Sequence, residues 1–387
     1  MDRKKICLNL FLLLCLSLKS QSNVPSIGVN NKYEIANWNV EWLGKTGNFG
    51  PLNDTLQQQN VIDVISQSNI DIWALCEISN KPVFDSMMTK LPDYDYKIAN
   101  YFPEQKTAIL YKKNEFTLLE SKLLGTQNPD SFSTYRFPFL VKLLPTNNLG
   151  IDTLFLIVVH LKANTGNNTE KLEALNSRKK SAQWLKMYLN KEHSNRNTIV
   201  LGDWNDDLDE SIFNGNPSPF NVLLDNQFDF DFISKKLTYN NISTTAGFTN
   251  PIDHQLVSKK LLTHVQFNSP EVWRLDQFIT NYSNTTSDHY PVYSYFYQNA
   301  TSTLNLKYKN NYFVYPVPNH GELYFSDNVI NKFVEYTISN HVGTTVKKES
   351  SNYDGTSIQL SDLKSGFYTI EFKIDNKYYN QFFVLEN

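Results

Sequence analysis

The sequence predicts an α/β domain followed by a small all-β domain. From Tyr33 to about Tyr297, short apolar runs alternate with helical patterns, which indicates an α/β arrangement of two or four layers. From Tyr312 onward the chain contains only short strand-like runs separated by turn residues, as in a small β-sandwich. Because 41% of the residues are hydrophobic, both domains can bury a core, and global disorder is excluded.

Strands and helices of the first domain follow from apolar spacing. Two segments repeat apolar residues at helical intervals, roughly Asn53 to Gln67 and Thr169 to Lys191. Nine short apolar runs have the length and composition of strands. These runs are Glu34–Val40, Ile70–Cys76, Tyr94–Ala99, Thr107–Tyr111, Phe139–Leu144, Leu154–His160, Thr198–Leu201, Asp253–Val257 and Pro291–Phe296.

The N-terminus has the pattern of a secretory signal peptide. A basic stretch, Asp2 to Lys5, precedes the almost wholly apolar segment Ile6 to Leu18, which is too short to span a bilayer comfortably. We therefore expect residues 1–21 to be removed on export. The alternative is a buried N-terminal helix, but the segment lacks an amphipathic period.

A polar stretch separates the two domains. Residues 299–311 are rich in Asn, Thr, Ser and Lys and are predicted to form a linker between a domain at 30–298 and a β-sandwich at 312–387. Seven strands are predicted in the second domain. They are Tyr312–Tyr315, Glu322–Phe325, Phe333–Ser339, Thr344–Lys348, Ser357–Leu360, Gly366–Ile374 and Tyr378–Leu385.

Net charge and cysteine content limit how the chain could bind nucleic acid and whether it could form a disulfide. The formal net charge is -3, and the first 20 residues carry four bases and one acid, so the remainder carries -6. A protein that coats nucleic acid without specificity is usually basic, so any binding to polyanions must use a local patch or a metal ion. After removal of the signal peptide only Cys76 remains, which excludes an intramolecular disulfide.

Polar residues at the ends of apolar runs are the strongest functional signal. Gly202-Asp203-Trp204-Asn205 follows one run and Ser287-Asp288-His289 precedes another, while two further runs end on Glu77 and His160. Strand ends that present carboxylate, amide and imidazole groups are typical of metal-assisted hydrolytic sites.

The same positions could belong to other kinds of site. A calcium-binding helix–loop–helix is excluded because Leu208 and Asn214 stand where the loop needs Gly and Glu. The spacings of zinc sites and the Gly-x-Ser-x-Gly of serine hydrolases are absent. Two alternatives stay open: a simple polar turn at Asp203–Glu210, and histidines that are merely satisfied polar residues.

Six segments, in order, resemble the endonuclease/exonuclease/phosphatase superfamily, which includes pancreatic-type deoxyribonuclease, abasic-site endonucleases and neutral sphingomyelinases. The resemblance covers roughly residues 33 to 297 and implies a four-layer α/β/β/α sandwich of two mixed sheets. The segments are Asn37–Trp42, Ala74–Glu77, Val159–Leu161, Gly202–Asn205, Ile252–His254 and Ser287–His289, with Ser131–Lys142 as a further match.

The resemblance implies a metal site. Glu77 would ligate Mg²⁺, with Mn²⁺ as the alternative, because these hard cations favour carboxylates and water. Asn39 would sit beside the ion, and Asp288 would make a direct or indirect contact with it.

The resemblance also implies catalytic roles. His289 would act as the general base on water and would be oriented by Asp253. Asp203 and Asn205 would assist the leaving oxygen or hold the phosphate, and His160 would donate a hydrogen bond to a phosphate oxygen.

An arginine is the expected phosphate ligand. Arg136 lies in a Phe-Ser-x-x-Arg-x-Pro-x-x-Val-Lys segment close to one in the pancreatic-type enzyme, and a guanidinium fork suits a phosphate. The alternative for Arg136 is a surface ion pair. Lys162, Arg178 and Lys179 are further candidate phosphate contacts. The family's histidine-orienting glutamate has only Glu104 as a candidate near the strand Thr107–Tyr111.

The C-terminal domain resembles the sorting domain of type IX secretion cargo. The matching segments are Val314–Asn319 and Leu360–Tyr368. A carbohydrate-binding β-sandwich is the alternative. Together with the signal peptide, the resemblance implies export through the periplasm of a Gram-negative bacterium to the cell surface or beyond, with the secretion machinery as a partner.

These observations predict a secreted Mg²⁺-dependent phosphodiesterase, a monomer that acts as an endonuclease on extracellular DNA or RNA. Two alternatives lie within the family: a sphingomyelinase-like lipid phosphodiesterase and an inositol-polyphosphate phosphatase. A catalytically inactive surface-binding module is the alternative from another class.

Overall fold

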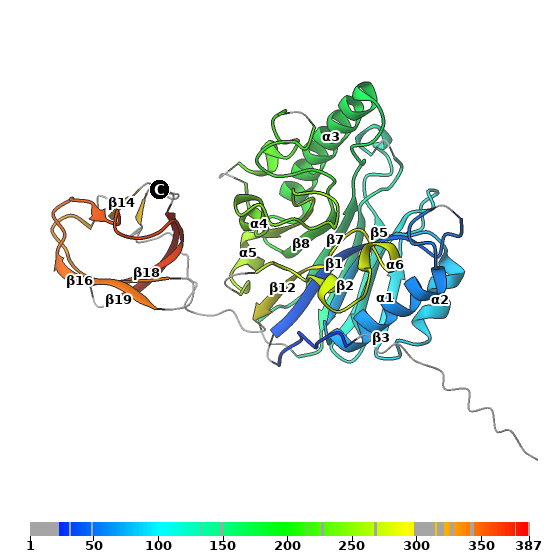
Figure 1. Ribbon diagram of the computed structural model, residues 1–387, viewed down its shortest axis with the longest axis horizontal. Coiled ribbons are helices and arrows are strands. Elements are labelled where there is room, and N and C mark those ends of the chain that lie inside the picture. Colours follow the sequence, from blue (N-terminus) through cyan, green and yellow to red (C-terminus); the bar gives the residue numbers. More distant parts are fainter. Residues whose placement is uncertain are drawn as a thin grey trace, which may run out of the picture. The chain divides into compact units, whose positions relative to one another are not determined.

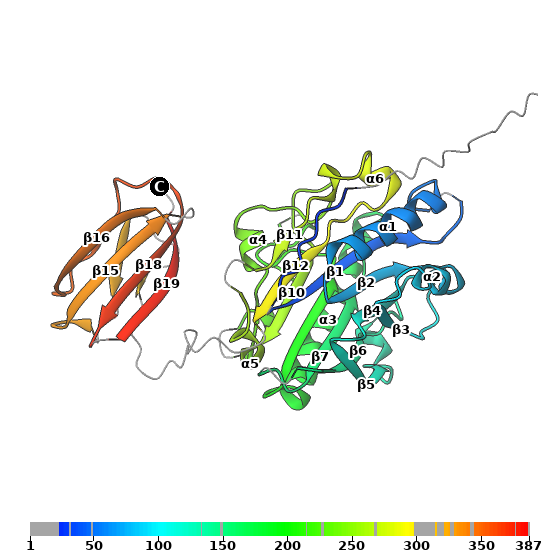
Figure 2. The same ribbon diagram turned by 90° about the horizontal axis from the view of Figure 1, so that it is seen from below.

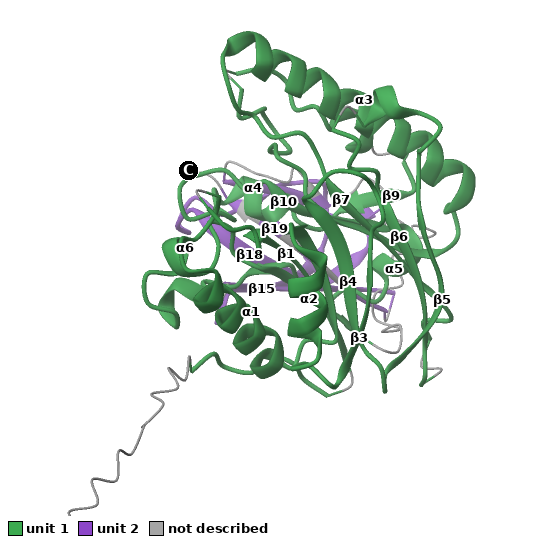
Figure 3. Ribbon diagram, turned by 90° about the vertical axis from the view of Figure 1, so that its right-hand side faces the viewer, with its two compact units in different colours: residues 1–304 green, residues 305–387 purple. Residues whose placement is uncertain are grey.

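The computed structural model divides into two compact units, residues 1–304 and 305–387 (Figure 3). It describes residues 23–297 except 31, 48, 133, 148–149, 214, 226–227 and 267–268, and residues 314–385 except 316–320, 326–328, 341–343 and 376. The expected signal peptide (1–21) and linker (299–311) lie outside these described ranges. Among the described residues, no helix is long and apolar enough to cross a membrane.

The first unit contains two six-stranded mixed sheets. One sheet has the order β11-β12-β1-β2-β4-β3, in which β1 and β2 are parallel and the other neighbours are antiparallel. Its strands are β1 (Lys32–Leu43), β2 (Ile72–Ile78), β3 (Tyr94–Ile98), β4 (Lys106–Lys112), β11 (Glu271–Val272) and β12 (Val292–Tyr297).

The other sheet has the order β5-β6-β7-β8-β10-β9, and only β7 and β8 are parallel. Its strands are β5 (Phe116–Leu123), β6 (Phe139–Pro145), β7 (Leu154–His160), β8 (Asn197–Asp203), β9 (Phe230–Phe232) and β10 (Asp253–Ser258).

Helices cover the outer faces of the two sheets. Helix α3 lies on one side of the sheets, and α1 and α2 lie on the other (Figure 1). Asn167 caps α3, and its backbone N–H in turn donates to Glu170, so the long helix begins with a capping box. The helices are α1 (Asp54–Ser68), α2 (Lys81–Met88), α3 (Asn168–Glu192), α4 (Lys235–Tyr239), α5 (Lys259–Leu262) and α6 (Tyr282–Thr285), with 3₁₀ turns at Pro129–Ser131, Asn221–Leu223 and Leu275–Gln277.

Successive side chains on the strands point to opposite faces of the sheets, and they contribute to three hydrophobic cores. On β2, Trp73 and Leu75 pack against α1 and α2, whereas Ala74 and Cys76 face the second sheet. On β8, Val200 faces α3. Strands buried on both faces read as continuous apolar runs, which is why the sequence located them. The four-layer α/β/β/α prediction is confirmed.

The strands and helices that the sequence missed lack an apolar run. Strand β5 is an edge strand whose side chains are mostly exposed, and β9 and β11 are only three and two residues long. Helix α2 has eight residues, too few to show a helical period.

The second unit is an all-β sandwich, as predicted. A three-stranded sheet, β13-β14-β17, accompanies a four-stranded sheet, β16-β15-β18-β19, whose strands run side by side in Figure 2. Buried residues from both sheets, including Leu323, Ile338 and Phe372, form one core. The strands are β13 (Val314–Tyr315), β14 (Glu322–Phe325), β15 (Phe333–Asn340), β16 (Thr345–Asn352), β17 (Ile358–Gln359), β18 (Gly366–Ile374) and β19 (Lys377–Leu385).

Candidate active site

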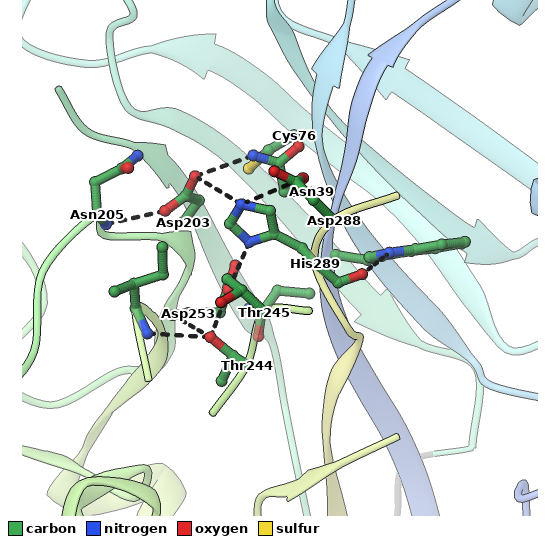
Figure 4. A network of polar contacts seen from close by, with 12 residues as sticks. Asn39, Cys76, Asp203, Asn205, Thr244, Thr245, Asp253, Asp288 and His289 are labelled. Atoms are coloured by element: carbon green, nitrogen blue, oxygen red, sulfur yellow. Dashed lines mark hydrogen bonds and ion pairs between the residues drawn. The ribbon is translucent and has the colours of Figure 1, made fainter. Parts of the chain in front are cut away.

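The topology brings the predicted site residues to one edge of the two sheets. Strands β1 and β2 are parallel and carry Asn39 and Glu77 toward their carboxyl ends, and β7 and β8, also parallel, end on His160 and Asp203. Strand β10 runs antiparallel to β8, so its first residue, Asp253, lies opposite Asp203. Figure 4 shows Asn39, Asp203 and Asp253 of this cluster together with His289.

Asn39 links carboxylates from the two sheets. Its Nδ2 donates to Oε1 of Glu77 and to Oδ2 of Asp203, both at 3.0 Å. Its Oδ1 accepts the backbone N–H of Glu41, so the amide orientation is fixed. The backbone N–H of Trp42 donates to the other oxygen of Glu77 at 3.0 Å. Asn39 therefore positions two carboxylates and turns its nitrogen, not its oxygen, toward the space between them.

Glu77, His160 and Asp203 form a group that could hold a metal ion. One ligand atom from each lies within 4.8 Å of the others. Nε2 of His160 is 3.5 Å from Oε1 of Glu77 and 3.5 Å from Oδ2 of Asp203. Two carboxylates facing each other fit a hard divalent cation such as Mg²⁺ or Mn²⁺, whereas the imidazole suits Mg²⁺ poorly.

His289 and Asp253 form a buried pair. Nδ1 of His289 lies 2.8 Å from Oδ2 of Asp253, and the Thr244 hydroxyl donates to the same oxygen at 2.8 Å. Nε2 of His289 faces Oδ2 of Asp203 at 4.0 Å. The carboxylate therefore fixes the ring and leaves Nε2 directed into the site. Sequence reasoning missed Thr244, because no motif marks the loop that brings it to Asp253.

Burial and charge set the protonation of this pair. Burial opposes a charge on the His289 ring, but the Asp253 carboxylate, with Asp203 and Asp288, raises the pKa of His289 well above its usual value. Burial and the Asp253 carboxylate raise the pKa of Asp203 to about 7, although His289 opposes this shift. The Asp203 carboxyl can therefore exchange a proton near neutrality, whereas the carboxylates around His289 favour its protonated form.

His160 is neutral and is not held by Glu104. Burial lowers the pKa of His160 well below its usual value, and the charges of Arg136 and His289 lower it further. Its Nδ1 has no hydrogen-bond partner among the described residues. Glu104 instead pairs with Lys45 at 2.5 Å and is 58% exposed. The candidate orienting role of Glu104 is therefore wrong, because its loop turns the carboxylate to the surface.

Arg136 is buried beside the site and does not form a surface ion pair. Its guanidinium donates to the carbonyl of Leu161 at 2.9 Å, to Oε1 of Gln105 at 2.6 Å and to the Thr134 hydroxyl at 3.3 Å. Asn205 donates to the same Leu161 carbonyl at 3.1 Å. Arg136 and Asn205 thus meet at the residue that follows His160, and the alternative of a surface ion pair is wrong.

Asp288 lies apart from the group formed by Glu77, His160 and Asp203. Its side chain is half exposed, and its Oδ1 is 3.8 Å from Nε2 of His289. Its backbone N–H donates to Glu41 at 2.9 Å. Burial and the Asp288 carboxylate raise the pKa of Glu41 to about 7. Glu41 was not predicted as a site residue, although it lies in the Asn37–Trp42 segment.

Gly202 and Asn205 both have positive φ angles. Gly202 has φ +133, and a Cβ there would lie 2.1 Å from the carbonyl oxygen of Val159, so only glycine lets β8 approach β7 this closely. Asn205 has φ +57, which Asn tolerates better than most residues, and its N–H donates to Oδ1 of Asp203 at 2.9 Å. The turn thereby aims the Asp203 carboxylate.

Arg178 is not available for a phosphate. It is fully buried on α3, and its guanidinium contacts Asp206 at 2.8 Å and the carbonyl of Lys162 at 2.6 Å. It therefore ties α3 to the turn after β8 and to the loop after β7. The candidate phosphate contact at Arg178 is wrong because the helix stripe turns this residue inward.

A sequence profile of the endonuclease/exonuclease/phosphatase family matches residues 36–289. The chain belongs to this family. A second profile, of the secretion system C-terminal sorting domain, matches residues 313–386. A search of curated proteins found no match. The two family matches identify a hydrolase with a type IX sorting domain, which directs export to the cell surface or outside a Gram-negative cell.

Solved structures share the fold of the first unit. TDP2 from D. rerio, complexed with a single-strand DNA product, is 15% identical with a TM-score of 0.51, covering 69% of this chain and 99% of that one. The human Nocturnin catalytic domain is 16% identical (TM-score 0.50, coverage 70% and 96%), and a family protein from Bacteroides vulgatus is 17% identical (TM-score 0.50, coverage 68% and 98%). At these identities the likeness is one of fold.

Proposed function

We propose that this family member is a secreted, Mg²⁺-dependent phosphodiesterase that acts as an endonuclease on extracellular DNA or RNA. The observation that carries the proposal is the cluster at one sheet edge, where Glu77 and Asp203 face the imidazoles of His160 and His289. Carboxylates, a buried His–Asp pair and a neutral histidine together supply the groups that water-mediated phosphodiester cleavage needs.

Glu77 would hold the metal ion. Its carboxylate is the more accessible of the two, 12% exposed against 2% for Asp203. A divalent cation bound there would neutralise phosphate charge and, by its own positive charge, lower the pKa of His289.

His289 is the proposed general base. Its Nε2 points into the site and takes the proton of the attacking water, while Asp253 holds Nδ1 and stabilises the imidazolium that forms. The hydrogen bond from Thr244 keeps the carboxylate of Asp253 in place.

Asp203 is proposed to assist the leaving oxygen. Burial favours the protonated form of this carboxyl, which can then donate its proton to the leaving oxygen as the bond breaks. Neutral His160 and the amide of Asn205 would hold the phosphate oxygens. Arg136 would bind phosphate only by exchanging one of its present bonds, such as that to Gln105, for a phosphate oxygen.

A substrate panel tests this proposal. Purified protein with Mg²⁺ is incubated with supercoiled plasmid, single-stranded DNA, RNA, sphingomyelin and inositol phosphates. We expect cleavage of nucleic acid. If nucleic acids stay intact while a phospholipid or an inositol phosphate is hydrolysed, the nuclease assignment is wrong and the corresponding alternative replaces it. If every substrate stays intact, the inactive binding module replaces both.

A further inference from the structure

Three exposed aromatic rings lie on loops next to the site. Phe102, Tyr135 and Phe248 are 99%, 57% and 70% exposed. Isolated exposed rings are common on protein surfaces, so exposure alone carries no function. Whether these rings have a function depends on their position relative to the catalytic groups.

Two of the rings flank the side of the site formed by His160. Tyr135 directly precedes Arg136, which bonds to the carbonyl of Leu161, the residue after His160. Arg136 also bonds to Gln105, three residues beyond Phe102, so both rings belong to segments anchored on this one guanidinium.

The third ring flanks the proposed base. The backbone N–H of Phe248 donates to the hydroxyl of Thr245 at 3.2 Å, and residue 245 forms a β-bridge with His289. In the same loop, the backbone N–H of Ala246 donates to the carbonyl of Asp288 at 2.7 Å. One ring therefore belongs to a loop that is bonded to the proposed base and its neighbour, and two rings belong to segments that are joined at Arg136.

Resting on the function proposed above, we propose that these rings stack on the bases of a single-stranded nucleic acid and make it the preferred substrate. In a duplex the bases stack on one another and present only their edges to a protein. In a single strand every base offers a face, and stacking on aromatic side chains tolerates any sequence.

Charge favours the same substrate. Removing the first 20 residues (net +3) and the segment from Thr301 onward (eight bases, nine acids) leaves the catalytic unit with net charge -5. Such a unit repels the dense phosphates of a duplex more than those of a single strand. Stacking adds affinity that does not depend on cations.

A membrane surface fits these loops less well. Tyr135 packs edge-on against the partly buried Phe137, with ring centroids 6.3 Å apart, and the charged, exposed Glu104 lies two residues from Phe102. Insertion into a lipid interface needs a continuous apolar surface, usually flanked by basic residues, and this unit is acidic.

Binding of labelled oligonucleotides of about ten nucleotides tests the proposal. In a His289→Ala background, which slows cleavage, fluorescence anisotropy compares the binding of single-stranded DNA, single-stranded RNA and duplex DNA. Phe102→Ala, Phe248→Ala and Tyr135→Asn, which suits the positive φ at 135, should each weaken single-strand binding about fivefold to a hundredfold. Because stacking releases no counterions, the factor should be the same at low and high salt.

Tyr378→Ala is the matched control, since this ring is 70% exposed but lies in the C-terminal unit; it should leave binding unchanged. Phe102→Trp should bind single strands at least as tightly as the protein with Phe102 does, because its ring can still stack. Three outcomes would each overturn the proposal. The ring variants could bind single strands as tightly as the control does, or the protein could bind duplex more tightly than single strands. The ring variants could also lose binding to phosphatidylcholine vesicles while they keep binding to oligonucleotides.

A small diester, bis(4-nitrophenyl) phosphate, separates this inference from the proposed function. If wild-type protein hydrolyses it but the ring variants bind oligonucleotide normally, the stacking inference is wrong and the phosphodiesterase stands. If wild-type protein fails to hydrolyse it and the oligonucleotides, the proposed function is wrong, whatever the rings bind.

Discussion

Replacing Asp253 with Asn should move the acid limb of the pH–rate profile and lower the rate. The Asp253 carboxylate lies 2.8 Å from Nδ1 of His289 and is a main cause of the raised pKa of this histidine. An opposite charge at such a distance shifts a pKa by about 1–3 units. A general base works only when neutral. The acid limb should therefore move to lower pH by about 1–3 units in Asp253→Asn.

The plateau rate should fall as well. The Asn amide neither fixes Nδ1–H nor stabilises the imidazolium, so part of the hundredfold to ten-thousandfold contribution of a general base should be lost. The profile is measured as kcat/KM for a small diester between about pH 4 and 9, at saturating Mg²⁺.

Glu120→Gln is the matched control, because it removes one negative charge from the edge strand β5, away from the site, where the side chain is 43% exposed. Its profile should overlay that of the wild type. If Asp253→Asn leaves the acid limb in place, or moves it to higher pH, then Asp253 does not control the protonation of the catalytic base and the reasoning is wrong.

Three further predictions follow from other parts of the chain. Gly202→Ala should lower the free energy of unfolding by about 2–5 kcal/mol in urea denaturation, because its Cβ would lie 2.1 Å from the carbonyl of Val159 and φ is +133; an unchanged midpoint contradicts this. Burial lowers the pKa of His254 to about 3, so as pH falls the unfolded chain binds a proton before the folded chain does. The free energy of unfolding should therefore fall by roughly 1 kcal/mol per pH unit as pH drops below about 6.5. His254→Gln should make the free energy of unfolding less dependent on pH, and an unchanged dependence would refute this. A chain ending shortly after Tyr297 should keep its specific activity but remain in the periplasm of its host, and normal export would refute the sorting role.

Sequence reasoning located strands and motifs because those signals are local. The run Leu154–His160 matches β7 because both of its faces are buried and it ends on a polar residue. Two predicted helices agree with α1 and α3 to within one or two residues, since apolar spacing and caps mark them. Strand β5 was missed because its exposed side chains carry no apolar pattern.

The side-chain partners were harder to predict, since they depend on contacts between distant segments. Thr244 contacts Asp253 through a loop that no motif marks. Glu104 lies near β4 in the sequence, but only the folded loop shows that its side chain turns outward to Lys45. Arg178 reads as an exposed cation in the sequence, and its burial against Asp206 depends on how α3 packs on the second sheet.

The most direct test of the central proposal is hydrolysis of bis(4-nitrophenyl) phosphate by the purified chain, with Mg²⁺ or chelator, for the wild type and for His289→Ala and Glu77→Gln. The account predicts turnover that a chelator abolishes and Mg²⁺ restores. His289→Ala should lower the rate at least a hundredfold while the protein stays folded, and Glu77→Gln should raise the Mg²⁺ concentration needed for half-maximal rate. Full activity in excess chelator, or a near-normal rate for His289→Ala, would contradict it.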